Sequence, residues 1–321
     1  MTAFLERLGI ALPIVQAGMG GGLATHPLAA AVSEAGGLGT IGFLGPDDLR
    51  RELDGAREAT GRPIAVNLLL PFARRLHWDA ASAADVLVTF WGAPRRGSAR
   101  LWIHQCGSVE EALAARAAGA DAVIAQGVEA GGHVRGDLPA LELLARLADA
   151  LPDDYPVLSA GGLADAHDVR ARLAAGAEAV VLGTRFLLTP ESGAHPEYRR
   201  RLLAAERTIV TELFGAGWPA PHRVVPNAAT ERWLRGDPRG PAWLRGLQRA
   251  TAPALARVSA PIQLRMAATQ RPGLPIYGPA AALAGGPDNL LDAGPLYAGE
   301  SVARIGDVRP AAELVRELAG A

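Results

Sequence analysis

A joint between a helix and a strand recurs three times along this sequence. Each copy has an alanine-rich helix end, a glycine and then a short apolar run, and the three copies span residues 35–42, 118–125 and 175–182. Glycine often ends a helix because it has no Cβ to oppose a left-handed cap. Fully apolar strands are typical of a sheet that is covered on both faces. The repeated joint therefore predicts βα units and a parallel sheet.

Short apolar runs provide eight candidate strands for that sheet. They span residues 14–16, 38–42, 64–67, 86–90, 101–104, 122–125, 157–159 and 179–182. Amphipathic helices are predicted between them, at residues 27–35, 46–58, 109–118, 139–150 and 166–175. Eight strands in this alternation predict an α/β fold of the (β/α)8 TIM barrel type, with an open doubly wound sheet as the alternative.

The connection between the fourth and fifth candidate strands is unusually short. Residues 91–100 separate the two strands and are rich in glycine, proline and arginine. A parallel crossover normally needs about a dozen residues or more. Either the fourth helix is missing or reduced to a turn, or one of the two strands is wrongly assigned.

The character of the sequence changes after Thr189. Residues 190 to about 266 favour helices, residues 273–306 are rich in glycine and proline, and a last helix is predicted at 310–318. We therefore predict three segments. They are a cofactor-binding barrel (1–189), a smaller, mostly helical substrate subdomain over the barrel mouth (190–306), and a C-terminal helix that returns to the barrel (307–321).

Composition excludes several classes of protein. The formal net charge is -1 and 49% of the residues are hydrophobic, which argues for a globular enzyme and against nucleic-acid binding. No apolar run is long enough to span a membrane, no signal peptide is evident, and Cys106 is the single cysteine, so we expect a cytoplasmic protein. The histidines lack metal-ligand spacing, so we expect no metal. The sequence contains no lysine, which excludes a Walker-type phosphate site and Schiff-base chemistry.

The loop 126–136 carries the most prominent candidate for chemistry. It follows an apolar strand and places His133 among glycines, which let a ligand approach the backbone closely. A barrel of this type keeps its active site at the strand ends, and imidazole suits acid–base work near neutral pH. The alternative is a glycine-rich turn with a solvated histidine.

Two other strand exits favour a phosphate site. Gly161 and Gly162 follow the seventh candidate strand, and Thr184 follows the eighth. Loops at these two places commonly bind phosphate through backbone N–H groups. The alternative is a pair of ordinary tight βα turns.

The cofactor that fits such a mouth is FMN. No G-x-G-x-x-G fingerprint follows a strand, which argues against a Rossmann dinucleotide site. Asn67 and Gln126 are amides at strand exits and could hydrogen-bond to the edge of a flavin ring, while Met19 could pack on the ring. Asn67 could equally be a polar strand end.

Several stretches together resemble the nitronate monooxygenase family, formerly called 2-nitropropane dioxygenases. They are Pro13–Met19, Ala35–Gly42, Val66-Asn67, Ala125–His133 (AQGVEAGGH), Ser159–Gly162 (SAGG), Gly183–Phe186 (GTRF) and Pro295–Gly299 (PLYAG). They span nearly the whole chain. The E-A-G-G-H stretch is shared with the related FMN-dependent enoyl-acyl-carrier-protein reductases. Two positions depart from the family pattern, since Val134 separates the histidine from Arg135-Gly136, and Glu300 stands where glutamine is usual.

The resemblance implies an FMN-containing TIM barrel with His133 as the catalytic residue. Together with the strand-exit glycines, it gives the predicted cofactor-binding set Ala17, Gly18, Met19, Asn67, Gln126, Gly131, Ser159, Gly161, Gly162, Gly183 and Thr184. Tyr297 and His104 are candidate substrate contacts, with plain packing as the alternative for each.

The implied reaction is oxidation of an alkyl nitronate by flavin and O₂ to a carbonyl compound and nitrite. His133 would either attract the anion or, when neutral, remove the α-proton of a nitroalkane. The alternatives are an NAD(P)H-dependent enoyl-thioester reductase and a non-catalytic barrel that binds FMN or another phosphorylated ligand. The expected partners are a small-molecule substrate and O₂, with a homodimer as one option for the assembly.

Overall fold

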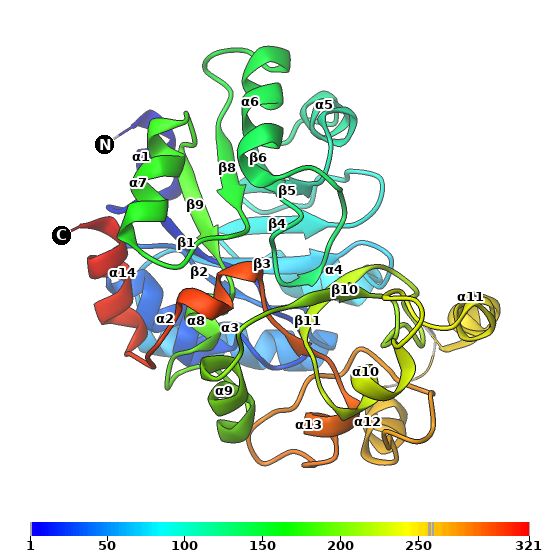
Figure 1. Cartoon of the computed structure of the whole chain (residues 1–321). Coiled ribbons are helices and arrows are strands. Elements are labelled where there is room, and N and C mark those ends of the chain that lie inside the picture. The colour runs from blue at the N-terminus through cyan, green and yellow to red at the C-terminus, as the bar shows by residue number, and fades with distance from the viewer. Residues whose placement is uncertain (1, 256–257, 259, 321) are drawn as a thin grey trace. The chain divides into compact units, whose positions relative to one another are not determined.

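The computed structural model describes residues 2–255, 258 and 260–320 and is drawn in Figure 1. The chain forms two compact units. The barrel unit comprises Met1–Glu129, Arg135–Gly193 and Asp307–Ala321, and the second unit comprises Ala130–Val134 and Ala194–Gly306. Each unit therefore contains residues from distant parts of the sequence.

Parallel strands form the centre of the barrel unit. They are β1 (Ile14–Gln16), β2 (Gly39–Ile41), β3 (Ile64–Leu69), β4 (Val86–Phe90), β5 (Leu101–Cys106), β6 (Ala122–Gln126), β8 (Val157–Ala160) and β9 (Ala179–Leu182). Their order in the sheet is β1-β9-β8-β6-β5-β4-β3-β2. A parallel bridge between Val15 and Leu38 joins the two ends of this order. The predicted (β/α)8 barrel is thus confirmed, and all eight predicted strands are present.

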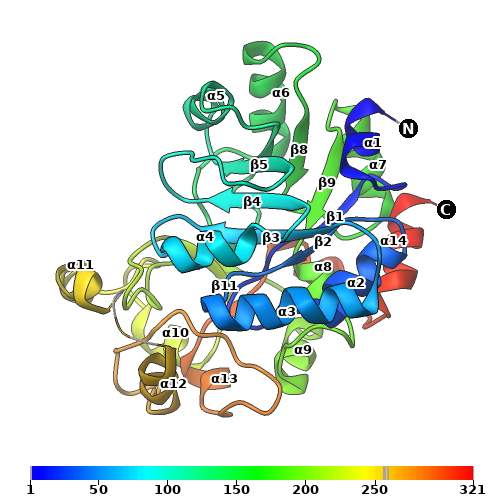
Figure 2. The ribbon, with the colours of Figure 1, turned by 180° about the vertical axis from the view of Figure 1, so that it is seen from behind.

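Helices pack around the outside of these strands (Figures 1 and 2). They are α2 (His26–Glu34), α3 (Pro46–Ala59), α4 (Arg75–Ala81), α5 (Val109–Ala117), α6 (Ala140–Ala150), α7 (Ala166–Ala174), α8 (Thr184–Leu187) and α14 (Ala311–Ala319). The short first helix, α1 (Ala3–Leu8), instead packs against side chains that face the barrel interior. The five helices predicted between strands are present, and α4 was not predicted. The last helix, α14, packs against α2 and α7 through an apolar face that includes Leu314, Val315 and Leu318.

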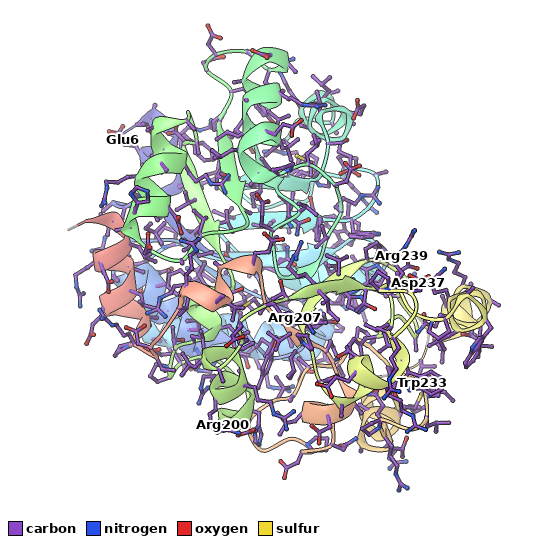
Figure 3. The ribbon with its side chains drawn as sticks, in the orientation of Figure 1. Glu6, Arg200, Arg207, Trp233, Asp237 and Arg239 are labelled. Atoms are coloured by element: carbon purple, nitrogen blue, oxygen red, sulfur yellow. The ribbon has the colours of Figure 1, made fainter. Side chains whose placement is uncertain are left out.

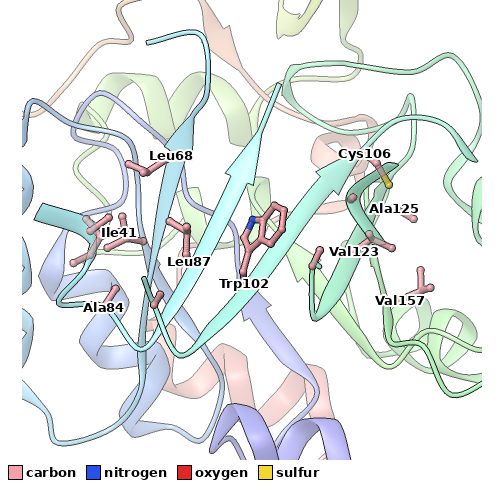
Figure 4. Packing of buried hydrophobic residues seen from close by; sticks show 14 of the residues in the cluster. Ile41, Leu68, Ala84, Leu87, Trp102, Cys106, Val123, Ala125 and Val157 are labelled. Atoms are coloured by element: carbon pink, nitrogen blue, oxygen red, sulfur yellow. The ribbon is translucent and has the colours of Figure 1, made fainter. Parts of the chain in front are cut away.

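The alternation of side chains along the strands produces two apolar layers. Inward residues such as Ile103 and Ile124 form one cluster with Phe4, Leu5 and Leu8 of α1. Outward residues form another cluster, which includes Leu87, Trp102, Cys106, Val123 and Val157 (Figure 4). The strands are apolar on both faces because both faces are buried. This is why they could be recognised as short continuous apolar runs.

No helix lies between β4 and β5 among the described residues of the segment 91–100. The segment crosses the outer face of the barrel directly, and a Cβ on Gly97 would lie 2.8 Å from Cδ2 of Leu87 and 3.2 Å from the Trp78 ring. Trp91 has a φ of 65° and Gly92 a φ of 133°, so the chain turns sharply as it leaves β4. Both strand assignments were correct, and the helix is missing. The indole of Trp102 is fully buried in the same outward cluster as Leu87.

A four-stranded antiparallel sheet forms the centre of the second unit. Its strands are β7 (Gly132–His133), β10 (Ile209–Thr211), β11 (His222–Val225) and β12 (Leu296–Tyr297). The helices of this unit are α9 (Pro196–Leu203), α10 (Ala228–Trp233), α11 (Ala242–Leu255), α12 (Ala260–Ala268), α13 (Leu290–Ala293) and the 3₁₀ helix η1 (Glu300–Arg304). The sequence predicted a mostly helical segment here, and the sheet is an addition to that prediction.

Aromatic side chains help to stabilise the second unit. Trp233, labelled in Figure 3, packs edge-on against Trp243 with ring centroids 6.2 Å apart and donates Nε1–H to the Pro272 carbonyl at 2.9 Å. Phe214 and Tyr277 are fully buried in the same apolar cluster. Across both units, none of the helices in the described ranges has the length and hydrophobicity needed to cross a bilayer.

Candidate active site

Polar side chains occupy the inward positions where several barrel strands end. Asn67 lies two residues after the inward Ala65 on β3, and Gln105 and Gln126 hold the equivalent places after Ile103 and Ile124. Because side chains alternate along a strand, these three amides face the barrel interior at its carboxyl end. This is the end of a (β/α)8 barrel that carries active sites. Asn67 and Gln126 are almost fully buried.

The segment after β1 passes directly over this polar layer. A Cβ on Gly18 would lie 2.4 Å from the Asn67 Cβ and 3.0 Å from Cγ2 of Thr40, so no larger residue fits there. Gln16 holds the segment in place, since its Oε1 accepts a hydrogen bond from the Thr40 N–H at 2.9 Å. The Thr40 hydroxyl is buried and makes no hydrogen bond to any described residue. A buried hydroxyl in this state is a candidate for contact with a ligand.

Gln126 is connected to the loop that carries the histidine. Its Oε1 accepts a hydrogen bond from the Arg135 N–H at 3.1 Å. The Arg135 guanidinium pairs with Glu111 at 2.5 Å and lies 5.0 Å from the centroid of the Trp91 ring. The backbone and the guanidinium of Arg135 are thus both held in place. The hydrogen bond from its N–H in turn orients the side-chain amide of Gln126.

Glu129, the acid of the E-A-G-G-H stretch, has a local structural role. Its two carboxylate oxygens accept hydrogen bonds from the Ala140 N–H at 3.1 and 3.0 Å. Ala140 is the first residue of α6, so the carboxylate satisfies an otherwise unpaired helix N–H and complements the helix dipole. The glutamate stabilises the end of the loop and is not a catalytic candidate.

The predicted phosphate loops lie at the ends of β8 and β9. Gly161 and Gly162 have φ values of 108° and 75°, which favour glycine at both positions. The Gly161 carbonyl accepts a hydrogen bond from Nη2 of Arg172 at 3.1 Å. Thr184 begins α8 and is buried. A Cβ on Gly183 would lie 3.7 Å from the Ala17 Cβ and 4.0 Å from Sδ of Met19, so the ends of β1 and β9 adjoin.

Two predicted site residues lie on the outer face of the barrel strands. Ser159 alternates with the inward Leu158 and Ala160, and its hydroxyl is buried without a hydrogen bond to any described residue. His104 follows the inward Ile103, so its ring also points outward. These placements do not support a cofactor contact by the Ser159 side chain or a substrate contact by His104.

His104 instead belongs to a buried chain of hydrogen bonds. Trp102 donates its indole N–H to Oγ1 of Thr89 at 2.7 Å, and the same oxygen lies 2.8 Å from Nδ1 of His104. Because the indole can only donate, the Thr89 hydroxyl keeps a proton that it can give to the imidazole. Burial lowers the pKa of His104 to about 4, an effect that nearby Glu111 opposes and Arg135 reinforces. His104 is therefore a neutral structural residue.

In the second unit, three ring-bearing side chains share one face of the antiparallel sheet. His133 is paired with His222, and Val224 is paired with Tyr297. Directly paired residues and residues two apart on one strand lie on the same face. The ring of His133 accordingly lies 5.3 Å from that of His222 and 5.8 Å from that of Tyr297, between centroids.

Trp218 covers the ring of His133. The two ring centroids are 3.5 Å apart and the planes are inclined by 13°, which is a stacked arrangement. Burial, and then the neighbouring His222, lower the pKa of His133 well below its usual value of 6.5. His133 is therefore neutral at pH 7, with a ring orientation fixed by its strand and by the indole.

His222 supports this arrangement from the adjacent strand. Its Nδ1 lies 2.9 Å from the Ala220 carbonyl, and its Nε2 accepts the Phe214 N–H at 3.4 Å. The carbonyl can only accept, so the proton is on Nδ1, and both ring nitrogens are used. Burial lowers the pKa of His222 to about 4. It is a neutral structural histidine beside the catalytic candidate.

Tyr297 and Gly131 explain why two distant motifs occur together. Tyr297 donates its phenolic O–H to the Pro279 carbonyl at 3.0 Å, and burial raises its pKa. A Cβ on Gly131 would lie 2.5 Å from the Gly299 nitrogen and 2.6 Å from the Ala298 carbonyl carbon. The E-A-G-G-H loop therefore requires glycine where the P-L-Y-A-G segment packs against it.

The predicted residues thus fall into three groups. The barrel strand ends hold Ala17, Gly18, Met19, Asn67, Gln126, Gly161, Gly162, Gly183 and Thr184, while the second unit holds Gly131, His133 and Tyr297, and the outer barrel face holds Ser159 and His104. Sequence reasoning missed Trp218, His222 and Arg172, because nothing in the sequence near each residue signals its tertiary contacts. In the described part of the chain, no group of three acidic, histidine or cysteine residues could hold a metal ion.

Comparisons with known proteins give the family. A family model described as nitronate monooxygenase matches residues 2–93 and 94–320. A nitronate monooxygenase of Pseudomonas aeruginosa is 36% identical over 267 residues, covering 65% of this chain and 76% of that protein. A probable nitronate monooxygenase of Bacillus subtilis is 31% identical over 269 residues, covering 67% and 77%. A Mycobacterium tuberculosis protein named as a carboxyl-CoA dehydrogenase is 32% identical over 255 residues, covering 74% and 69%.

Solved structures agree with this assignment. FabK from Thermotoga maritima aligns with a TM-score of 0.77 and 29% identity, covering 99% of this chain and 94% of that one. Nitroalkane oxidase from Streptomyces ansochromogenes aligns with a TM-score of 0.72 and 31% identity, covering 98% and 97%. The resemblance predicted from the motifs is therefore confirmed, and the chain belongs to the nitronate monooxygenase family.

Proposed function

We propose that this protein is an FMN-dependent enzyme that oxidises alkyl nitronates with O₂ to a carbonyl compound and nitrite. Family membership carries the reaction class. The observation that carries the role of His133 is its buried, neutral ring, stacked 3.5 Å from Trp218 on a strand of the E-A-G-G-H loop. We propose the barrel as the cofactor unit and residues 190–306 as the substrate subdomain, and we expect a cytoplasmic protein.

The barrel residues fit FMN. The inward amides of Asn67 and Gln126 suit the polar edge of an isoalloxazine ring, and the unpaired Thr40 hydroxyl lies in the same layer. The glycine loop Gly161–Gly162 and the Thr184 hydroxyl suit its phosphate. The chemistry that FMN supplies when bound is transfer of electrons from the nitronate to O₂.

The lowered pKa of His133 favours one of its two candidate roles. A lowered pKa makes the imidazole a weak base, which disfavours removal of a proton from a neutral nitroalkane. A neutral imidazole can still donate one hydrogen bond to an anionic nitronate oxygen, and a negative charge beside it raises its pKa again. We therefore propose that His133 orients a nitronate that enters as the anion.

Oxygen consumption tests this proposal. Protein loaded with FMN should consume O₂ and release nitrite with a pre-formed alkyl nitronate, and much more slowly with the parent nitroalkane at the same pH. His133→Ala should lower kcat/KM for the nitronate by about 10²-fold without releasing FMN. No O₂ consumption with any nitronate would overturn the proposed reaction. Equal rates with nitroalkane and nitronate would overturn the role assigned to His133.

A second candidate function is NAD(P)H-dependent reduction of an enoyl thioester. It is favoured by the 0.77 TM-score to FabK and by the similarity to a carboxyl-CoA dehydrogenase. Anaerobic bleaching of the flavin by NADPH, but not by a nitronate, would select this reaction instead.

A further inference from the structure

A buried arginine lies beneath the loop that we assign to the phosphate of FMN. Arg172 is on α7, the helix that follows the Gly161–Gly162 loop (Figure 1), and is 7% exposed. Its Nη2 donates to the Gly161 carbonyl at 3.1 Å. Its Nη1 is buried and makes no hydrogen bond to any described residue. Burying a guanidinium is costly, so this position calls for a compensating role.

Two nearby carboxylates compensate part of that cost. Glu129 and Asp168 are close enough to raise the pKa of Arg172, which burial lowers. However, the Glu129 oxygens accept hydrogen bonds from the Ala140 N–H, and Oδ2 of Asp168 accepts one from the Ala164 N–H at 2.7 Å. Both acids are thus engaged by the backbone of neighbouring segments. An arginine remains protonated at neutral pH, so its charge persists beneath the loop.

The hydrogen bond to Gly161 also orients the loop. The Gly161 carbonyl and the Gly162 N–H belong to one peptide plane, and none of the described peptide bonds is cis. In a trans peptide these two groups point in opposite directions. Because Arg172 holds the carbonyl, the Gly162 N–H is directed away from the guanidinium. The φ of 75° at Gly162 requires a residue that tolerates this backbone.

The other arginine near the phosphate loops has a different partner. Arg185 follows Thr184 but is bound to Asp307, through Nη1 to the carbonyl oxygen at 3.0 Å and through Nη2 to the carboxylate at 2.5 Å. The chain has no lysine. Arg172, by contrast, contacts the Gly161–Gly162 peptide directly, through its hydrogen bond to the Gly161 carbonyl.

We propose that Arg172 is a positioning residue for the phosphate of FMN, which fixes the Gly161–Gly162 peptide and supplies positive charge beneath it. This inference depends on the proposed FMN site. It assigns to a helix arginine the electrostatic role that lysine performs in many phosphate sites.

FMN and riboflavin, which differ only in the phosphate, provide the test. The affinity of the purified apoprotein for each flavin is measured by fluorescence quenching, and the ratio of the two affinities isolates the phosphate. Arg172→Met should lower the FMN affinity about tenfold or more and leave the riboflavin affinity within about twofold. Arg172→Lys keeps the positive charge, so its preference for FMN over riboflavin should lie between those of the wild type and Arg172→Met. Arg170→Met changes an exposed arginine on the same helix and should match the wild type.

An unchanged FMN-to-riboflavin ratio in Arg172→Met would overturn the inference. An equal loss of affinity for both flavins, with a lower unfolding temperature, would also overturn it, because a merely structural arginine gives that result. If Arg172→Met does not fold, Arg172→Gln keeps a donor without the charge and should show the same selective loss. Failure of the wild-type protein to bind FMN would instead overturn the proposed function.

Discussion

The buried histidine on the outer barrel face makes a quantitative prediction about acid stability. His104 is 1% exposed, and burial lowers its pKa to about 4. In the unfolded chain the pKa of histidine is about 6.5. As the pH falls below 6.5, His104 therefore becomes protonated in the unfolded chain but stays neutral in the folded protein. The contribution of His104 to the free energy of unfolding is therefore fully present above pH 6.5 and decreases progressively down to about pH 4.

The size of the effect follows from these two pKa values. At pH 7.5 the titration of His104 lowers the free energy of unfolding by almost nothing. At pH 5 the difference in proton binding between the unfolded and folded chains lowers it by about 2 kcal/mol. A carboxylate with an ordinary pKa near 4 changes little over the same interval. Since a domain is stable by only about 5–15 kcal/mol, a change of this size is measurable.

Urea unfolding of wild type and His104→Gln at pH 8.5, 7.5, 6.5 and 5.0 is the assay. Glutamine removes the titration and can still hydrogen-bond to Thr89. The two free-energy curves should run parallel between pH 8.5 and 7.5. Below pH 6.5 the wild type should lose about 2 kcal/mol more than the variant by pH 5. Parallel curves over the whole range would refute the assignment of His104 as a buried neutral group.

Two glycine positions give further predictions. Gly18→Ala would place a Cβ 2.4 Å from the Cβ of Asn67, so the FMN affinity should fall at least tenfold while the protein still folds. An FMN affinity equal to that of the wild type would contradict the placement of Asn67 beneath this segment. Gly131→Ala would place a Cβ 2.5 Å from the Gly299 nitrogen, where only backbone atoms could move away. Calorimetry should therefore show a loss of about 1–3 kcal/mol in the free energy of unfolding. An unchanged unfolding temperature would argue against this contact.

The barrel could be predicted because its signals are local. Each strand is a short apolar run between helices, and β1, β4 and β9 begin and end as predicted, at Ile14–Gln16, Val86–Phe90 and Ala179–Leu182. The same uniform hydrophobicity hides which residues face inward. In β5, His104 and Gln105 are adjacent polar residues, and only the packed structure shows that Gln105 faces inward.

The antiparallel sheet of the second unit could not be predicted in the same way. Its strands are two to four residues long, and the pairing of His133 with His222 joins residues far apart in the sequence. Sequence reasoning identified His133 from its glycine neighbours and from the family resemblance. The stacking of Trp218 on its ring results from the tertiary fold, so the neutral state of the histidine became evident only in the structure.

The assignment of Ala130–Val134 to the second unit has a consequence for how this protein could diversify. In the sequence, Ala130–Val134 lie between two parts of the barrel unit, which end at Glu129 and resume at Arg135. Their partner strand, β11 (His222–Val225), lies about 90 residues later in the chain. Changes in residues 194–306 can therefore alter the surroundings of His133 while the barrel loops stay as they are. In a library for directed evolution, mutations confined to that segment should change substrate preference more often than flavin affinity, and a truncated barrel lacking it would lose the strand that pairs with His133.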